Sequence, residues 1–107
     1  DLGITSWGHR ANPYHYLAMA YVTGAPWNEC HFSDPEIDRM VEELGSEMDH
    51  AKRVELYHEI QKGMIERAPI IISGFNESIM ACNKNLRGLK PHVSSEVFDF
   101  AQAYFEE

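Results

Sequence analysis

The chain has 107 residues, 44% of them hydrophobic, which provides for one modest core and for one domain at most. Its formal net charge is −8, from 17 acidic and nine basic residues, so its field opposes a polyanion and we expect no nucleic-acid partner. No apolar run approaches the roughly 18 residues that span a bilayer. Because the chain opens on Asp1, inside what reads as a structural element, we expect a fragment or processed product whose signal peptide would lie upstream.

The start of the chain predicts a strand followed by a helix. Residues 2–7 lead into Gly8 and fit a short strand that runs into a loop. After Pro13, apolar side chains recur at the i, i+3, i+4, i+7 spacing of a helix face until Gly24 ends the pattern. We expect a helix over 13–22, with proline tolerated in its first turn. Its apolar stripe is Tyr14, Leu17, Ala18 and Tyr21.

Two longer helices are predicted in the middle of the chain. The tetrapeptide SDPE at residues 33–36 combines a capping box with proline and acids near the first turn. It predicts a helix over 34–44 with Gly45 as its C-cap. Asp49 can cap a further helix over 49–67. The two helices should pack through their apolar faces, which are Ile37, Met40, Val41 and Leu44 on the first and Val54, Tyr57, Ile60, Met64 and Ile65 on the second.

The remainder of the chain predicts part of a sheet. Residues 70–72 are three isoleucines, the pattern of a strand that is buried on both faces inside a sheet. Residues 79–82 form a second β-like stretch, residues 83–91 a turn-rich basic segment, and residues 98–105 a final strand or short helix. With the helices, this order predicts an α/β or α+β fold whose sheet lacks partners.

Two Glu-x-x-His spacings raise an alternative function. Glu47 with His50 and Glu55 with His58 match the carboxylate and imidazole supply of a di-metal helical bundle, which would make the chain a metal-binding helical protein or enzyme. Such sites need two further inward glutamates, and the first pair spans a predicted helix break. We therefore favour solvated helix residues over metal ligands.

The cysteines and three other histidines leave further possibilities open. Cys30 and Cys82 permit one disulfide or two buried thiols. His9, His15 and His31 could supply a metal or metal-chelate site, but their spacing carries no ligand signature. We expect no metal site, no cofactor and no catalytic residue.

Five motifs follow one another in the chain: GITSWG at 3–8, NP at 12–13, Asn28 ahead of FSDPEID at 32–38, KRVELYHEIQ at 52–61 and APII at 68–71. In order and spacing they resemble the C-terminal stretch of the family 5 solute-binding proteins, the dipeptide-, oligopeptide- and nickel-binding proteins of ABC importers. Each motif is common by itself, and their combination is fairly specific.

The resemblance implies a type II periplasmic-binding-protein fold, in which two α/β lobes close over a ligand. Residues 1–84 would belong to the second lobe, and residues 85–107 would cross the hinge and return a strand to the first lobe. The implied function is capture of a small solute, peptide-like or anionic, for import. The implied partners are the small-molecule ligand, the rest of the binding protein and the membrane permease, in a periplasmic or other extracytoplasmic location, free or lipid-anchored. The missing sheet partners could also drive self-association.

The resemblance also implies that the loop after the first strand faces the ligand. In the peptide binders, an Asp at the position of Arg10 serves as counter-ion to the ammonium group of the peptide. A guanidinium instead offers a planar fork to carboxylate or phosphate, so Arg10 favours an anionic ligand unless it is a surface residue paired with an acid. Trp27 is equally compatible with the cleft and the core. The predicted ligand-binding residues are Trp7, Gly8, His9, Arg10, Trp27 and Asn28.

Overall fold

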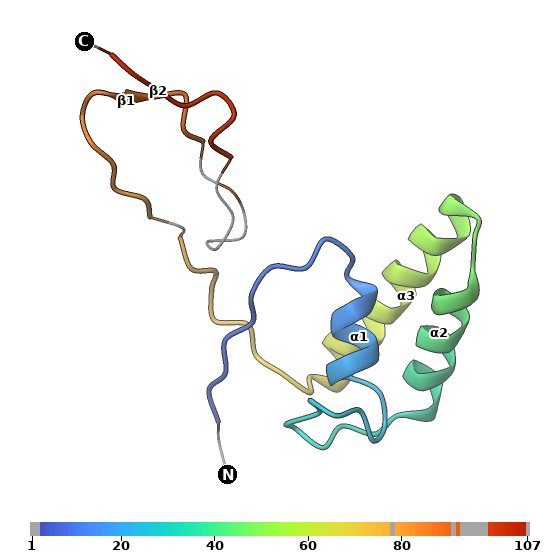
Figure 1. The fold of residues 1–107 in the computed structure, drawn as a ribbon. Coiled ribbons are helices and arrows are strands. Elements are labelled where there is room, and N and C mark those ends of the chain that lie inside the picture. Colours follow the sequence, from blue (N-terminus) through green and yellow to red (C-terminus); the bar gives the residue numbers. More distant parts are fainter. Residues whose placement is uncertain (1–2, 78, 91, 93–98, 107) are drawn as a thin grey trace. The chain divides into compact units, whose positions relative to one another are not determined.

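The computed structural model describes residues 3–77, 79–90, 92 and 99–106, and the chain divides into two compact units (Figure 1). The helical unit is Arg10–Ile72, and the other unit joins Asp1–His9 to Ser73–Glu107. The elements in chain order are α1 (Tyr14–Ala20), α2 (Pro35–Ser46), α3 (His50–Arg67), β1 (Leu86–Arg87) and β2 (Tyr104–Phe105). The predicted boundary between lobes at residues 84 and 85 does not coincide with a boundary of these units, and it stays a prediction.

Helix α1 is confirmed but is shorter than the predicted range. Pro13 precedes it with φ −57°, a value that already suits a helix, and the side-chain oxygen of Asn12 accepts a hydrogen bond from the backbone N–H of Tyr14 at 3.0 Å. The helix ends at Ala20, and the chain then turns through Gly24, whose φ is +73°.

Helix α2 is confirmed, and its start is the predicted cap. The carboxylate of Asp34 accepts hydrogen bonds from the backbone N–H groups of Glu36 and Ile37, at 2.9 and 3.0 Å. The expectation that Gly45 ends the helix is wrong, because α2 continues to Ser46. Gly45 instead lets α1 approach, since a Cβ atom there would lie 2.7 Å from the hydroxyl oxygen of Tyr14.

Helix α3 is confirmed with the predicted cap and end. Asp49 accepts a hydrogen bond from the backbone N–H of Lys52 at 3.0 Å, and Ala68, which precedes a proline, leaves the helical conformation with φ +46°. Its inward face differs from the prediction at two positions. Val54 is 38% exposed and Ile65 is 78% exposed. Both lie off the inward stripe of α3, which runs through Tyr57, Ile60 and Met64.

The core of the helical unit lies around α2, which contacts both α1 and α3. All four predicted apolar residues of α2 are buried, together with Ile60 of α3. The half-buried side chains that pack against this cluster are Tyr14, Leu17, Ala18, Val22, Phe32, Leu56, Tyr57 and Met64. The prediction that the second and third helices pack together through their apolar faces is therefore confirmed.

The second unit holds a short antiparallel sheet. Leu86 pairs with Phe105 and Arg87 with Tyr104, and an isolated bridge joins Lys90 to Asp99. Within the described part of residues 98–105, the prediction of a strand holds only for β2. The basic segment 83–91 contains the predicted turn at residues 84–85 and, in addition, β1.

Three predicted strands are wrong for this chain. Residues 3–7, 70–72 and 79–82 adopt no strand, and Ile71 is 88% exposed although a strand buried on both faces was expected. A strand needs a neighbour to satisfy its backbone N–H and C=O groups, and apolar sequence alone does not supply one. The α/β, type II periplasmic-binding-protein fold stays a prediction.

Candidate functional site

The predicted ligand-binding residues divide between the two units. Trp7, Gly8 and His9 belong to the sheet-bearing unit, where Trp7 is half-buried and the other two are exposed. Arg10, which is exposed, begins the helical unit that also contains Trp27 and Asn28. The role of these six residues in ligand binding stays a prediction.

Asn28 organises the loop between α1 and α2. Its side-chain nitrogen donates to the carbonyl oxygens of Val22 and Phe32 at 3.1 and 2.7 Å, and its side-chain oxygen accepts from the backbone N–H of Phe32 at 2.9 Å. The same oxygen accepts from the thiol of Cys30 at 3.4 Å. In this chain the Asn28 amide therefore holds the loop in shape.

Trp27 lies on the surface of the same loop. Its side chain is 47% exposed, while its backbone N–H donates to the carbonyl oxygen of Met19 at 2.9 Å. Thr23 fastens the loop to α2, because its backbone N–H and its hydroxyl both donate to the carboxylate of Asp38, at 2.8 and 2.6 Å. Of the two possibilities left open for Trp27, the core is excluded in this chain.

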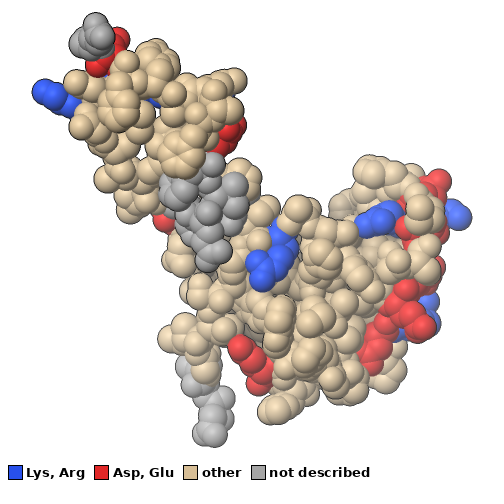
Figure 2. All heavy atoms as spheres, viewed as in Figure 1, with Lys and Arg blue, Asp and Glu red and all other residues tan. Residues whose placement is uncertain are grey.

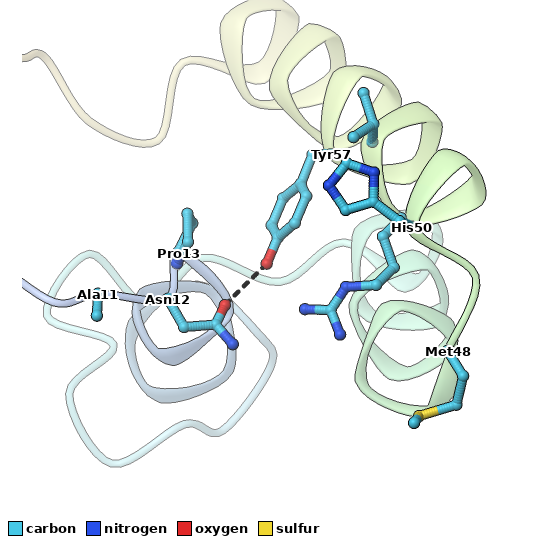
Figure 3. A pocket seen from close by; sticks show the side chains of 8 residues that line it. Ala11, Asn12, Pro13, Met48, His50 and Tyr57 are labelled. Atoms are coloured by element: carbon cyan, nitrogen blue, oxygen red, sulfur yellow. Dashed lines mark hydrogen bonds between the residues drawn. The ribbon is translucent and has the colours of Figure 1, made fainter.

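A hollow of about 450 Å³ lies in the helical unit, between the segment before α1 and the first half of α3 (Figure 3). The hydroxyl of Tyr57 crosses it and donates to the side-chain oxygen of Asn12 at 2.9 Å. The hollow is open to solvent, since Met48 at its rim is 90% exposed. Its lining residues are Ala11, Asn12, Pro13, Met48, His50, Arg53, Val54 and Tyr57.

We did not predict this hollow from the sequence, because only apolar residues were assigned to the inward face of α3 and Arg53 is charged. Arg53 is half-buried and lines the hollow with His50 and Tyr57. These three residues stand at positions i, i+3 and i+7 of one helix, which is the spacing of a single face. That spacing was a usable signal for α3, but nothing local indicated that Asn12 would face it.

The Glu-x-x-His residues and the cysteines do not form a metal centre in the described part of the chain. Glu47 stands at the end of α2 and His50 at the start of α3, and Glu55 and His58 are both exposed on α3. Across residues 3–77, 79–90, 92 and 99–106, no group of three or more His, Cys, Asp or Glu side chains could hold a metal ion.

The three histidines considered as possible metal ligands and both cysteine thiols are exposed. His9, His15 and His31 are solvent-accessible, although His15 itself belongs to α1. Cys30 and Cys82 are exposed free thiols, so neither of the two possibilities left open, one disulfide or two buried thiols, describes them in this structure.

An ion cluster joins the end of α3 to the start of α2. The guanidinium of Arg67 donates to the carboxylates of Asp34 and Glu36. The backbone N–H of Ile37, and after it the guanidinium of Arg67, hold the pKa of Asp34 below its ordinary value although partial burial opposes them. Because Asp34 is also the cap of α2, this cluster is structural.

The acidic side chains of the helical unit concentrate on α2, which carries Glu36, Asp38, Glu42 and Glu43 against one basic residue, Arg39. Figure 2 shows acidic side chains gathered on the side where α2 lies. Among the described residues that line the hollow none is acidic, so the charge of this lining differs from that of α2.

The chain is similar in sequence to a known dipeptide-binding protein. The chain is 28% identical over 82 residues to the dipeptide-binding protein DppE of Bacillus subtilis (strain 168). The aligned segment covers 77% of this chain and 15% of the length of that protein. No protein-family model matches the chain, and no solved structure gives a significant match. Among the described residues, no helix has the length and apolar character needed to cross a membrane.

Proposed function

We propose that this chain is part of the substrate-binding component of an ABC importer, which captures a small peptide-like or anionic solute outside the cytoplasm and delivers it to a membrane permease. The observation that carries the proposal is the 28% identity to a dipeptide-binding protein over most of the chain. The five motifs described above agree with it, because in order and spacing they resemble the same class of binding proteins. The component acts by binding and release rather than by catalysis.

The exposed apolar segment after α3 fits a larger polypeptide. Ile71, Ile72, Phe75 and Ile79 are each between 67% and 91% exposed. Exposed large apolar side chains that follow one another in the chain mark a segment that another structure covers. The chain spans 15% of its relative's length, so the proposed cover is the remainder of the binding protein, whose strands would pair with residues 70–72. Self-association is the expected behaviour of the chain by itself.

The ligand would meet the loop that contains Trp7 and Arg10. Arg10 is exposed and supplies a planar cationic fork, which suits a ligand carboxylate or phosphate. Trp7 supplies an aromatic surface of the kind that lines small-molecule clefts. Asn28 would then contribute by holding the loop between α1 and α2, since its side-chain amide bonds within that loop.

Isothermal titration calorimetry on the complete polypeptide that carries this chain tests the proposal. The probes are dialanine, longer alanine peptides and succinate, and we expect one of these classes to bind at one-to-one stoichiometry. Arg10→Ala should weaken binding on the order of tens-fold, because a desolvated charge-assisted contact is lost. Arg10→Lys should recover part of the loss, since a point charge does not reproduce the fork.

Arg39→Ala is the matched control, because Arg39 is a surface arginine of α2 that pairs with Glu43 at 3.1 Å. It should leave the affinity unchanged. Failure of every peptide and of succinate to bind the folded polypeptide would contradict the proposed function. If binding survives Arg10→Ala but not Trp7→Ala, the proposed function stands and the proposal of an anionic ligand fails.

A further inference from the structure

The hollow beside α3 contains an arginine, Arg53, that has no acidic partner among the residues that the structure describes. Within the described part of the chain, the guanidinium of Arg53 makes no hydrogen bond or ion pair, although the chain has 17 acidic residues against nine basic ones. Three other arginines, Arg39, Arg67 and Arg87, each pair with a carboxylate. Arg53 is half-buried, and its guanidinium has no acidic partner among the described residues.

Asn12 supplies a second donor, and its orientation is fixed by the chain itself. Its side-chain oxygen accepts two hydrogen bonds, from the backbone N–H of Tyr14 at 3.0 Å and from the hydroxyl of Tyr57 at 2.9 Å. Because the backbone N–H of Tyr14 can only donate, the atom of Asn12 that faces it must be the side-chain oxygen. The side-chain NH₂ group therefore points the other way. Among the described residues this NH₂ group has no acceptor, and Figure 3 shows Asn12 at the edge of the hollow.

The remaining lining combines one more polar donor with an apolar wall. The imidazole of His50 presents an N–H group in either charge state. Pro13, Met48 and Val54 contribute apolar surface, and the ring of Tyr57 forms part of the wall. The volume of about 450 Å³ lies within the range of small-molecule sites. N–H donors beside an apolar wall suit a ligand with an apolar body and one end that only accepts hydrogen bonds, such as a carboxylate.

We propose that this hollow is a binding site for a small organic carboxylate, held by a forked contact from Arg53 with Asn12 and His50 as further donors. The apolar wall selects a carboxylate with an apolar body over acetate or inorganic phosphate. The site uses none of the predicted residues Trp7, Gly8, His9 and Arg10, and it does not depend on the proposed transport function. Its variants also differ from those of the transport site, so either idea can fail alone.

A titration of the 107-residue chain with benzoate, followed by two-dimensional ¹H–¹⁵N NMR, tests the site. We expect shifts confined to the amides of residues 11, 12 and 48–57, with an affinity in the millimolar range. Acetate and inorganic phosphate should bind at least about fivefold more weakly, because neither has an apolar body to bury. Equal binding of phosphate and benzoate, or shifts outside these residues, would overturn the proposal.

Variants distinguish a specific contact of Arg53 with benzoate from a general effect of positive charge. Arg53→Ala should weaken benzoate binding about tenfold, and Arg53→Lys should restore part of it. Arg39→Ala removes the same charge from α2 and should leave the titration unchanged. Tyr57→Phe keeps the ring but removes the hydroxyl that orients Asn12, and should weaken binding several-fold while the spectrum stays that of a folded chain. An unchanged affinity in Arg53→Ala would refute the site.

Discussion

Gly63 of α3 lies against Ile37 of α2, and this contact makes a testable prediction about helix packing. Both residues are buried, and a Cβ atom added at Gly63 would stand 2.6 Å from Cδ1 of Ile37. The close approach of the two helices therefore depends on the missing side chain at position 63. We predict that Gly63→Ala and Ile37→Val compensate each other, because valine lacks the atom that the new methyl group would meet.

The magnitudes follow from the burial of Ile37, which is 0% exposed. Ile37→Val should destabilise the chain by about 0.5–1.5 kcal/mol, through lost burial and a small cavity. Gly63→Ala should cost about 1–3 kcal/mol in overpacking, offset by about 1 kcal/mol of helix propensity. In the double variant the overpacking is relieved and the propensity gain remains, so the coupling should favour the double variant by about 1–3 kcal/mol.

The assay is urea unfolding of the 107-residue chain and its three variants, followed by circular dichroism of the helices. Ile65→Val is the matched control, since it deletes the same atom from a residue of α3 that is 78% exposed. It should change the free energy of unfolding by less than about 0.5 kcal/mol. If the effects of Gly63→Ala and Ile37→Val add within about 0.5 kcal/mol, the two residues do not share this packing contact and the reasoning fails.

Three further predictions concern a carboxylate, a loop and a turn. The pKa of Asp34 is lowered on folding, so the stability that its carboxylate contributes is present above the ordinary pKa of 3.8 and is lost as the pH falls through the lower folded pKa. Thermal unfolding measured at decreasing pH should show this loss of stability. Asp34→Asn, which keeps a cap, should make the stability depend less on pH in this range. Asn28→Ala should destabilise by about 1–3 kcal/mol and alter the Trp27 fluorescence, because partly buried backbone groups lose their partners; unchanged unfolding and fluorescence would be the contrary result. Gly88→Ala should abolish the cross-strand nuclear Overhauser effects between β1 and β2, because φ is +76° there and a Cβ atom would lie 1.9 Å from the carbonyl oxygen of Gln102; their persistence would contradict this turn geometry.

Local signals in the sequence predicted the helices well. The cap at Asp34 and the apolar stripe of α2 were sufficient, since a cap acts on the next three residues and a stripe requires only a regular helical period. The same local rules failed where a neighbour decided the outcome. Gly45 was expected to end α2 and instead accommodates Tyr14 of α1, while Ile65 was expected in the core and is exposed.

The sequence by itself determined the capped helices, the apolar face that α2 buries and the resemblance to solute-binding proteins. Only the tertiary structure decided which isoleucines are buried, because burial depends on what packs against a residue and not on its own hydrophobicity. The same holds for the hollow beside α3. Tyr57 and Asn12 meet across it although they are 45 residues apart, and a contact between residues so distant in sequence exists only once the helices have packed.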